Sequence, residues 1–190
     1  MGLLSVMRKQ KLEQNCVRVL VLGLDNAGKT TVVRRLLGLG IENISPTAGF
    51  EIRSTVCGAF RVDFWDIGGQ KSIRPYWQNC FEQTDAVLWV VDSTDSARME
   101  DARRELSVLM SQNRLLFVPL LVMANKQDCA GALPPSSLST LLPARLKEGQ
   151  ASVAGTSGYT GENVDGAFGL LLEKVRAIRG LPSALISPCL

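Results

Sequence analysis

A segment near the start of the chain has the residue types and spacing of a phosphate-binding loop: Gly, four residues, and then Gly-Lys-Thr. Its residues are Gly23, Leu24, Asp25, Asn26, Ala27, Gly28, Lys29 and Thr30. A mainly apolar run, 17–22, precedes it, and 29–37 has the apolar spacing of a helix. A strand that enters a glycine turn and then a helix leaves several N–H groups unpaired beside the positive end of the helix dipole. The segment predicts a site for a di- or triphosphate, with a chance glycine-rich turn as the alternative.

Two side chains of this loop have specific chemistry to offer. Lys29 can bridge the β- and γ-phosphates, and the Thr30 hydroxyl can ligate Mg²⁺. The loop alone leaves ATPase, kinase and GTPase open, because all three use it.

Residues 125–128, Asn-Lys-Gln-Asp, follow a buried apolar run and bear on which base is bound. A carboxylate such as Asp128 can accept two hydrogen bonds, from guanine N1–H and the 2-amino group, whereas adenine has no such pair of donors. The Lys126 stem can lie over the base, and Asn125 can connect this segment to the phosphate loop. These residues favour guanine, and a polar turn after a strand is the alternative.

The elements that must position these residues alternate between strands and helices. We predict strands at 17–22, 51–56, 60–66, 86–92, 120–124 and 151–155, and helices at 29–37, after Asp95 or Ser96, and at 163–179. The second and third strands form a hairpin, which glycine-containing segments at 44–50 and 66–70 flank. Such alternation predicts an α/β fold with a mostly parallel sheet, in which ligands bind at the strand ends.

Composition excludes several classes of function. The 21 Lys and Arg against 18 Asp and Glu give a net charge of +3, too small to indicate nucleic acid as a partner. Histidine is absent, which excludes His-based triads, general bases and metal ligands. An odd number of scattered cysteines without a Cys-x-x-Cys pair predicts reduced thiols and a cytoplasmic protein. The longest apolar stretch, 115–124, contains Pro119 and is too short to span a bilayer.

We expect one domain at 17–179 with a short segment on each side. Residues 1–16 are predicted to be a basic amphipathic helix and a linker, and composition alone leaves a frayed terminus as the alternative. N-myristoylation is not expected, because the acylation pattern requires Ser or Thr where this chain has Val6. Residues 180–190 contain two prolines and no periodicity, which predicts a loose tail.

Four motifs stand in order along the chain: Gly-Leu-Asp-Asn-Ala-Gly-Lys-Thr-Thr, Pro-Thr-x-Gly-Phe, Trp-Asp-x-Gly-Gly-Gln and Asn-Lys-Gln-Asp. With them the chain resembles the Arf family of small GTPases over most of its length. Its start, Met1-Gly2-Leu3-Leu4-Ser5, together with Ile73-Arg74-Pro75-Tyr76-Trp77, looks most like the Arf-like branch of types two and three. The resemblance implies a P-loop GTPase (Ras-like) fold. This fold is a six-stranded, mostly parallel sheet with one antiparallel hairpin strand and helices on both faces.

The resemblance also implies where the metal is bound. Thr47 would close on Mg²⁺ and the γ-phosphate, so Thr30 and Thr47 are the expected metal ligands. Asp66 would hold the metal through water. Mg²⁺ and GTP or GDP are therefore the expected cofactor and nucleotide.

Further roles follow from the same resemblance. The Gly69 amide would meet the γ-phosphate, and Gln70 would orient the attacking water as the catalytic residue. Thr31 would reach the α-phosphate. The family's Cys/Thr-Ser-Ala loop, whose backbone N–H meets guanine O6, stands here as Thr-Ser-Gly and places Ser157 and Gly158 at the base.

The chain departs from the family at one surface position as well. The family's surface aromatic residues match at Phe50 and Trp65, but the third, a Tyr, is Cys80 here. The hairpin of the family slides by two residues when GTP binds and expels the N-terminal helix. Here Ile52, Ser54 and Val56 give the first hairpin strand only a modest apolar face to set its register. We expect GTP-dependent exposure of residues 2–12.

The resemblance implies a GTP/GDP molecular switch that hydrolyses GTP slowly by itself. A GTP-binding scaffold without significant turnover is the alternative, and a kinase is disfavoured because the chain has no Arg-rich lid and no use for Asp128. The implied partners are an exchange factor, an activating protein and GTP-dependent effectors, which include carriers of lipidated cargo, and the implied processes are cargo trafficking or cytoskeletal assembly. We expect a cytoplasmic monomer with at most weak peripheral membrane contact, and ciliary or cytoskeletal association as further options.

Overall fold

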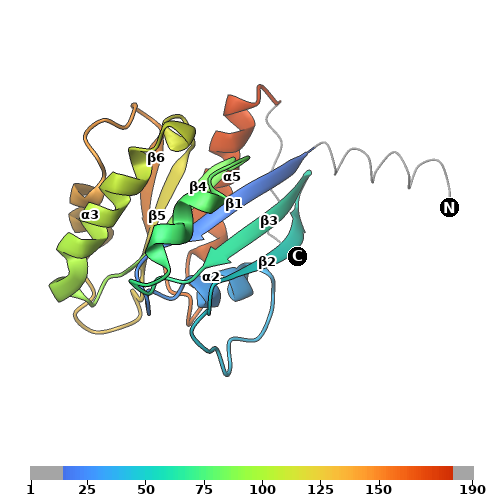
Figure 1. Ribbon diagram of the computed structural model, residues 1–190. Coiled ribbons are helices and arrows are strands. Elements are labelled where there is room, and N and C mark those ends of the chain that lie inside the picture. Colours follow the sequence, from blue (N-terminus) through green and yellow to red (C-terminus); the bar gives the residue numbers. More distant parts are fainter. Residues whose placement is uncertain (1–14, 182–190) are drawn as a thin grey trace.

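The computed structural model describes residues 15–181, which contain one six-stranded sheet (Figure 1). The strands are β1 (Cys16–Leu22), β2 (Phe50–Cys57), β3 (Phe60–Ile67), β4 (Ala86–Asp92), β5 (Leu120–Asn125) and β6 (Ala151–Gly155). They lie in the order β2-β3-β1-β4-β5-β6, with β2 antiparallel to β3 and every other neighbouring pair parallel. The predicted sheet is confirmed, including its single antiparallel hairpin strand.

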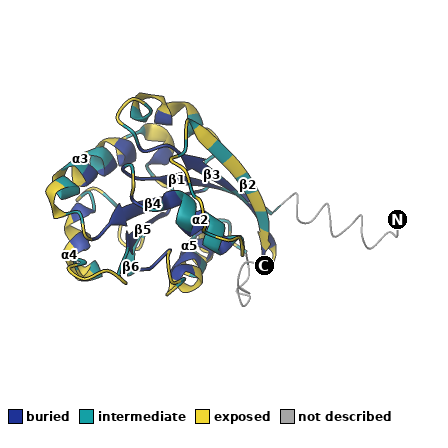
Figure 2. Cartoon of the chain, turned by 90° about the horizontal axis from the view of Figure 1, so that it is seen from below, coloured by how far each residue is buried: buried dark blue, intermediate teal, exposed yellow. Residues whose placement is uncertain are grey.

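Helices cover both faces of this sheet (Figure 2). The α-helices are α2 (Lys29–Leu36), α3 (Met99–Met110), α4 (Pro135–Leu138) and α5 (Val164–Ile178). The described residues also form four 3₁₀ helices: η1 (Arg74–Cys80), η2 (Ser96–Arg98), η3 (Asn113–Leu115) and η4 (Ser139–Leu141). The sequence did not predict η1, because so short a 3₁₀ segment has no repeating apolar pattern to detect.

Two apolar clusters lie on opposite faces of the sheet. On one face Leu36 of α2 and Phe168 of α5 pack against β1, β3 and β4. On the other face Leu106 of α3 and Trp77 of η1 pack with residues of β4 and β5. The sheet therefore has helices on both sides, as an α/β fold requires.

The central strands are buried on both faces and end in polar residues. Every residue of β4 and β5 is buried, which explains their continuous apolar sequences. The two strands are paired so that Asp92 lies opposite Asn125 at their carboxyl ends. The polar side chains that follow the strands are thus brought to one edge of the sheet.

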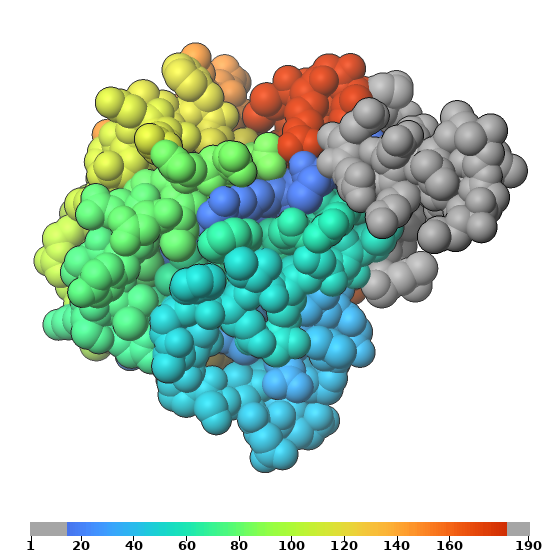
Figure 3. Space-filling view, turned by 45° about the vertical axis from the view of Figure 1, so that its right-hand side comes forward, coloured from blue at the N-terminus to red at the C-terminus, as the bar shows by residue number. Residues whose placement is uncertain are grey.

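Strand β2 carries apolar side chains at the molecular surface. Ile52 and Val56 are exposed, so the alternating apolar residues of β2 do not face the core. The reason is that β2 is the edge strand, and no helix within residues 15–181 covers the face that carries Ile52, beside Trp65 of β3. In Figure 3 the cyan and teal atoms of this hairpin lie at the molecular surface.

Some expectations concern the two ends of the chain. The predicted N-terminal helix and nearly all of the predicted tail lie outside the described residues, as does the expected exposure of residues 2–12.

Cys57 is disulfide-bonded, so the expectation of reduced thiols throughout is wrong at that position. An odd number of cysteines does not exclude a disulfide between two of them, and neither does their spacing in the sequence. Within residues 15–181, the helices are all too short or too polar to cross a bilayer.

Candidate functional site

The predicted phosphate loop connects the end of β1 to the start of α2. Gly28 has a φ of 92°, and a Cβ atom there would lie 2.3 Å from Asn125 Nδ2, so only glycine fits. The Lys29 ammonium donates hydrogen bonds to Gly23 O (3.1 Å) and Leu24 O (2.8 Å). The Lys29 side chain therefore folds back over the phosphate loop, and its charge lies at the centre of the loop.

The environment of Lys29 lowers the pKa of its ammonium from 10.5 to about 8. Burial is the main cause, and the carboxylates of Asp66 and Asp25 oppose it. An anionic ligand beside this buried ammonium would stabilise its charged form and raise its pKa again.

Three oxygen-bearing side chains meet beside Lys29. The Thr30 hydroxyl donates to Asp66 Oδ2 at 2.6 Å and lies 2.9 Å from the Thr47 hydroxyl. Burial raises the pKa of Asp66, and its Oδ1 is buried with no partner among the described residues. Hydroxyl and carboxylate oxygens with an unused buried acceptor suit Mg²⁺, a hard cation that prefers oxygen ligands. The residues present therefore fit this ion.

A cleft of about 370 Å³ lies next to this cluster. Its walls are the phosphate loop, Thr31, residues 44–47 and residues 68–70. Gly69 approaches the phosphate loop so closely that a Cβ atom on it would lie 2.4 Å from Asp25 N. No residue in the described part of the chain accepts a hydrogen bond from the Gly69 amide. Gln70 also lines the cleft, and its buried Oε1 has no partner there.

A second group of predicted residues lies at the ends of β5 and β6. Asn125 Nδ2 donates to Ala27 O at 2.9 Å, and Asn125 Oδ1 accepts from the Gly158 amide at 2.8 Å. One side chain thus joins the phosphate loop to both base-side segments, as predicted for Asn125. The Gly158 amide, assigned from the resemblance to guanine O6, is engaged with Asn125 in this conformation.

The two charged residues of the base-side segment have defined partners. Ser157 Oγ donates to Asp128 Oδ1 at 2.5 Å, and this bond is the main reason that the pKa of Asp128 is lowered. Lys126 Nζ donates to Asp92 Oδ2 at 2.6 Å. Burial raises the pKa of Asp92, but its bonds from Lys126 and Thr94 outweigh burial, and the net shift is downward. Asp128 is therefore oriented as an ionised acceptor.

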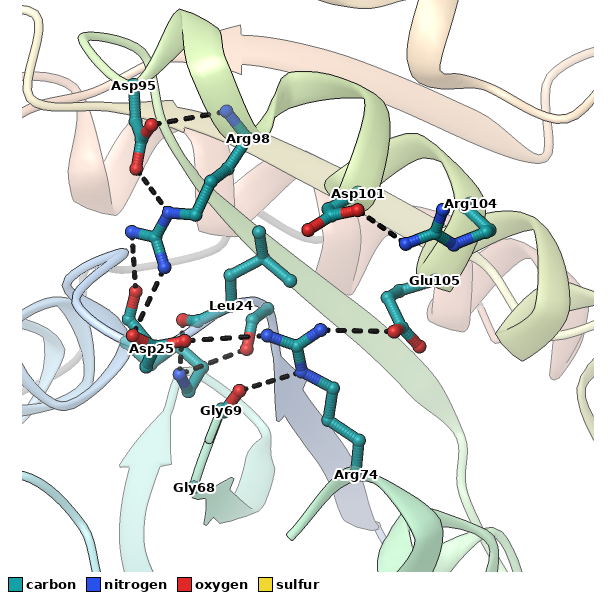
Figure 4. A network of polar contacts seen from close by, with 12 residues as sticks. Leu24, Asp25, Gly68, Gly69, Arg74, Asp95, Arg98, Asp101, Arg104 and Glu105 are labelled. Atoms are coloured by element: carbon teal, nitrogen blue, oxygen red, sulfur yellow. Dashed lines mark hydrogen bonds and ion pairs between the residues drawn. The ribbon is translucent and has the colours of Figure 1, made fainter. Parts of the chain in front are cut away.

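The sequence did not predict three arginines near these segments. Arg35 of α2 donates to Gly158 O at 3.2 Å and also bonds Tyr159 O, and so supports the base-side loop. Arg74 and Arg98 both pair with Asp25 of the phosphate loop (Figure 4). No motif spacing reveals these contacts, because the paired residues lie from 49 to 124 positions apart in sequence.

The missing surface tyrosine is replaced by a different arrangement. Phe50 stacks on Trp65 with ring centroids 5.7 Å apart, and the Arg18 guanidinium lies 3.5 Å from the centroid of the same tryptophan. Arg18 also donates to Cys80 O at 3.2 Å. The surface beside β2 is therefore built from two aromatic rings and a cation.

Comparison with known proteins agrees with this geometry. The chain matches the profile of the Arf (ADP-ribosylation factor) family over residues 3–175. It is 44% identical to ADP-ribosylation factor-like protein alp41 of Schizosaccharomyces pombe over 94% of this chain and 97% of that protein. It is 51% identical to ADP-ribosylation factor-like protein 3 of Chlamydomonas reinhardtii over 75% of this chain and 80% of that one.

A solved structure extends the likeness to three dimensions. The Arl6 BBS3 small GTPase from Trypanosoma brucei, with the bound nucleotide analogue GppNp, has a TM-score of 0.79 and 28% identity. The match covers 85% of this chain and 98% of that one. The chain therefore belongs to the ADP-ribosylation factor family, whose members are Ras-like small GTPases that bind and hydrolyse GTP.

Proposed function

We propose that this chain is a GTP/GDP switch whose closed form is recognised by other proteins. The observation that carries the proposal is the contact of Thr30 with both Thr47 and Asp66, beside the unpaired Gly69 amide. These groups come from the phosphate loop and from both segments that flank the β2–β3 hairpin. A γ-phosphate is the part of the nucleotide that could hold both flanking segments at once, so its loss would release them.

The proposed chemistry divides among these residues. Thr30 and Thr47 would hold Mg²⁺ directly and Asp66 through water, and the ion would neutralise charge on the β- and γ-phosphates. Lys29 and the loop amides of 23–30 would bind the phosphates, and Thr31 would reach the α-phosphate. Gln70 would orient the attacking water. Phosphoryl transfer needs mainly such positioning and charge neutralisation.

The base-side residues would select guanine. The ionised Asp128, oriented by Ser157, would accept from guanine N1–H and the 2-amino group, and the Lys126 stem would cover the ring. The Gly158 amide would have to share its proton between Asn125 and guanine O6. Ser157 and Gly158 thus belong to the proposed base site with Asn125.

Hydrolysis would be slow without a partner. The described residues that line the cleft include no arginine, the group that stabilises the charge of the transition state in such enzymes. An activating protein would supply it, and an exchange factor would release GDP. A scaffold that binds GTP without turnover is the competing function, and Gln70 with its unused buried oxygen favours turnover.

Effectors of the GTP form would read the exposed face that carries Phe50 and Ile52. The resemblance to the Arf-like branch of types two and three suggests carriers of lipidated cargo or tubulin assembly as the process served. We further propose that residues 1–16 and 180–190 flank a GTPase domain at 17–179, and that residues 2–12 become accessible in the GTP form. A cytoplasmic monomer with weak membrane contact at most is consistent with the absence of an acylation pattern.

Hydrogen exchange on the GDP form and on a form with a non-hydrolysable GTP analogue tests the switch. We expect slower exchange at 44–50 and 68–74 in the analogue form, because Thr47 and Gly69 would then be fixed, and faster exchange at 2–12. Residues 120–124 of β5 serve as the internal control, since they are buried in both forms. Equal exchange in both forms at 44–50 and 68–74 would contradict the proposed switch.

A further inference from the structure

Arg74 lies at the junction of three elements (Figure 4). From the start of η1, its Nε donates to Gly69 O at 2.9 Å, its Nη1 to Glu105 Oε1 of α3 at 3.1 Å, and its Nη2 to Asp25 Oδ1 at 3.4 Å. All three nitrogens of the guanidinium are thus used, each on a different segment. The side chain is only 8% exposed.

Arg74 spans the contact between the phosphate loop and the 68–70 segment. On the loop side of that contact it binds the carboxylate of Asp25, whose backbone amide would lie 2.4 Å from a Cβ atom on Gly69. On the other side it binds the carbonyl of Gly69 itself. A single planar group therefore connects the two sides of a contact that only glycine permits.

The carboxylate of Asp25 is fixed from its other side as well. Arg98 Nη1 donates to Asp25 Oδ2 at 3.1 Å, and Arg98 Nε donates to Asp95 Oδ2 at 2.6 Å. Burial raises the pKa of Asp25, yet its own backbone amide and the two arginines outweigh burial and lower it. Asp25 is therefore a fixed anionic anchor for Arg74.

The backbone of Gly68, next to Gly69, is also restrained. Trp77 Nε1 donates to Gly68 O at 3.0 Å, and the Gly68 amide donates to Gly49 O at 2.8 Å. Gly69 O is bound by Arg74, and the amide of Gly69 has no acceptor among the described residues. The surrounding bonds therefore orient the group assigned to the γ-phosphate.

We propose that Arg74 is a positioning residue for GTP hydrolysis: it bridges Asp25, Gly69 and Glu105, and so fixes the Gly69 amide and the adjacent Gln70 against the phosphate loop. The inference deepens the proposed function and rests on it, because the Gly69 amide is assigned there to the γ-phosphate. GDP has no γ-phosphate, so the bridge should matter for the GTP form and not for the GDP form. Lysine cannot replace it, because an ammonium lacks the planar fork that reaches three acceptors at once.

Arg74 does not act by placing its own charge on the phosphates. Its three nitrogens point to Gly69 O, Glu105 and Asp25, and it does not line the cleft that holds Lys29 and Thr30. A direct role would need these bonds to break. The structure assigns it instead to the support of the groups that touch the nucleotide.

The test compares dissociation of fluorescent GDP and of a fluorescent non-hydrolysable GTP analogue from wild type, Arg74→Met, Arg74→Lys and Glu105→Gln. Arg104→Met is the matched control, because Arg104 lies on α3 beside Glu105 but is 63% exposed and pairs only with Asp101 in the described structure. Gly69→Ala reports loss of the γ-phosphate contact itself, since its Cβ atom would meet the phosphate loop. Single-turnover GTP hydrolysis is measured on the same proteins.

We expect Arg74→Met to speed release of the GTP analogue by about tenfold, the effect of losing one charged hydrogen bond, and to leave GDP release unchanged. Hydrolysis should fall by roughly ten- to a hundredfold, because misplacement of a reacting group by about 1 Å costs that much. Arg74→Lys should resemble Arg74→Met, Glu105→Gln should show a smaller shift in the same direction, and Arg104→Met should behave as wild type.

Two results would overturn the inference while the proposed function stands. One is equal acceleration of the release of both nucleotides, which would mark Arg74 as a general structural support. The other is no change in nucleotide release or hydrolysis in any Arg74 variant. Should Arg74→Met fail to fold, the comparison rests on Arg74→Lys and Glu105→Gln. Failure of the proposed function looks different: wild type would not retain the GTP analogue, or Gly69→Ala would release it at the wild-type rate. Either of these would remove the premise and the proposal with it.

Discussion

The hydroxyl oxygens of Thr30 and Thr47 lie 2.9 Å apart, although 17 residues separate them in the sequence. Thr30 is in the first turn of α2, whereas Thr47 belongs to the loop before β2. Their contact closes that loop over the phosphate loop, and the Thr30 hydroxyl also donates to Asp66 Oδ2. The closed arrangement matches what a metal ion bound between them would require.

Thr47→Ala should weaken retention of a GTP analogue by about tenfold with Mg²⁺ present, because one oxygen ligand and its charged contact are lost. GDP retention should change little, since Thr47 would close on the γ-phosphate. Dissociation rates of the two fluorescent nucleotides are the measurement. In excess chelator the mutant and wild type should become equal, and a defect that persists there would argue against a metal ligand.

Asp128→Asn should lower GTP affinity by about a hundredfold, because two hydrogen bonds to an ionised acceptor are lost. The substitution should favour xanthosine nucleotides, whose 2-position carries an acceptor in place of guanine's donor. Competition binding with GTP and XTP measures this exchange. Wild-type GTP affinity in the mutant would mean that another residue reads the base.

Arg35→Ala should speed the release of GDP and of the GTP analogue by the same factor, about threefold to tenfold, because the base-side loop is common to both. Arg35 bonds the carbonyls of Gly158 and Tyr159 and so limits the freedom of a loop that carries a glycine beside the base. Arg34→Ala, on the same helix, is the control. A selective effect on one nucleotide would contradict this role.

Nucleotide binding should take up a proton at alkaline pH through Lys29. The lowered pKa means that the folded, nucleotide-free protein binds fewer protons than the unfolded chain between pH 8 and 10.5, so its stability rises with pH over that window. Bound phosphates would raise the pKa of Lys29 again and so restore the charge of its ammonium. Calorimetry with Mg²⁺ and GTP in two buffers of different ionisation enthalpy should show uptake of about three quarters of a proton at pH 8.5 and about a tenth at pH 7.0. Equal uptake at both pH values would contradict the assignment.

The sequence predicted the residues whose chemistry lies in contiguous motifs. The phosphate loop and the segment ending in Asp128 could be placed because a strand end fixes where they project. Arg74 and Arg35 could not, because their partners become neighbours only after the sheet and helices assemble. The exposure of Ile52 and Val56 could not be predicted, because alternation shows which residues share a face and not which face a helix covers.

The most direct test of a GTP-hydrolysing switch is single-turnover hydrolysis by wild type and Gln70→Leu. We predict a wild-type rate on the order of 10⁻⁴ per second without a partner. Gln70→Leu should bind GTP as tightly and hydrolyse it at least about tenfold more slowly, because leucine cannot orient the attacking water. Hydrolysis by Gln70→Leu at the wild-type rate, or a wild type that binds GTP and never turns it over, would contradict the account.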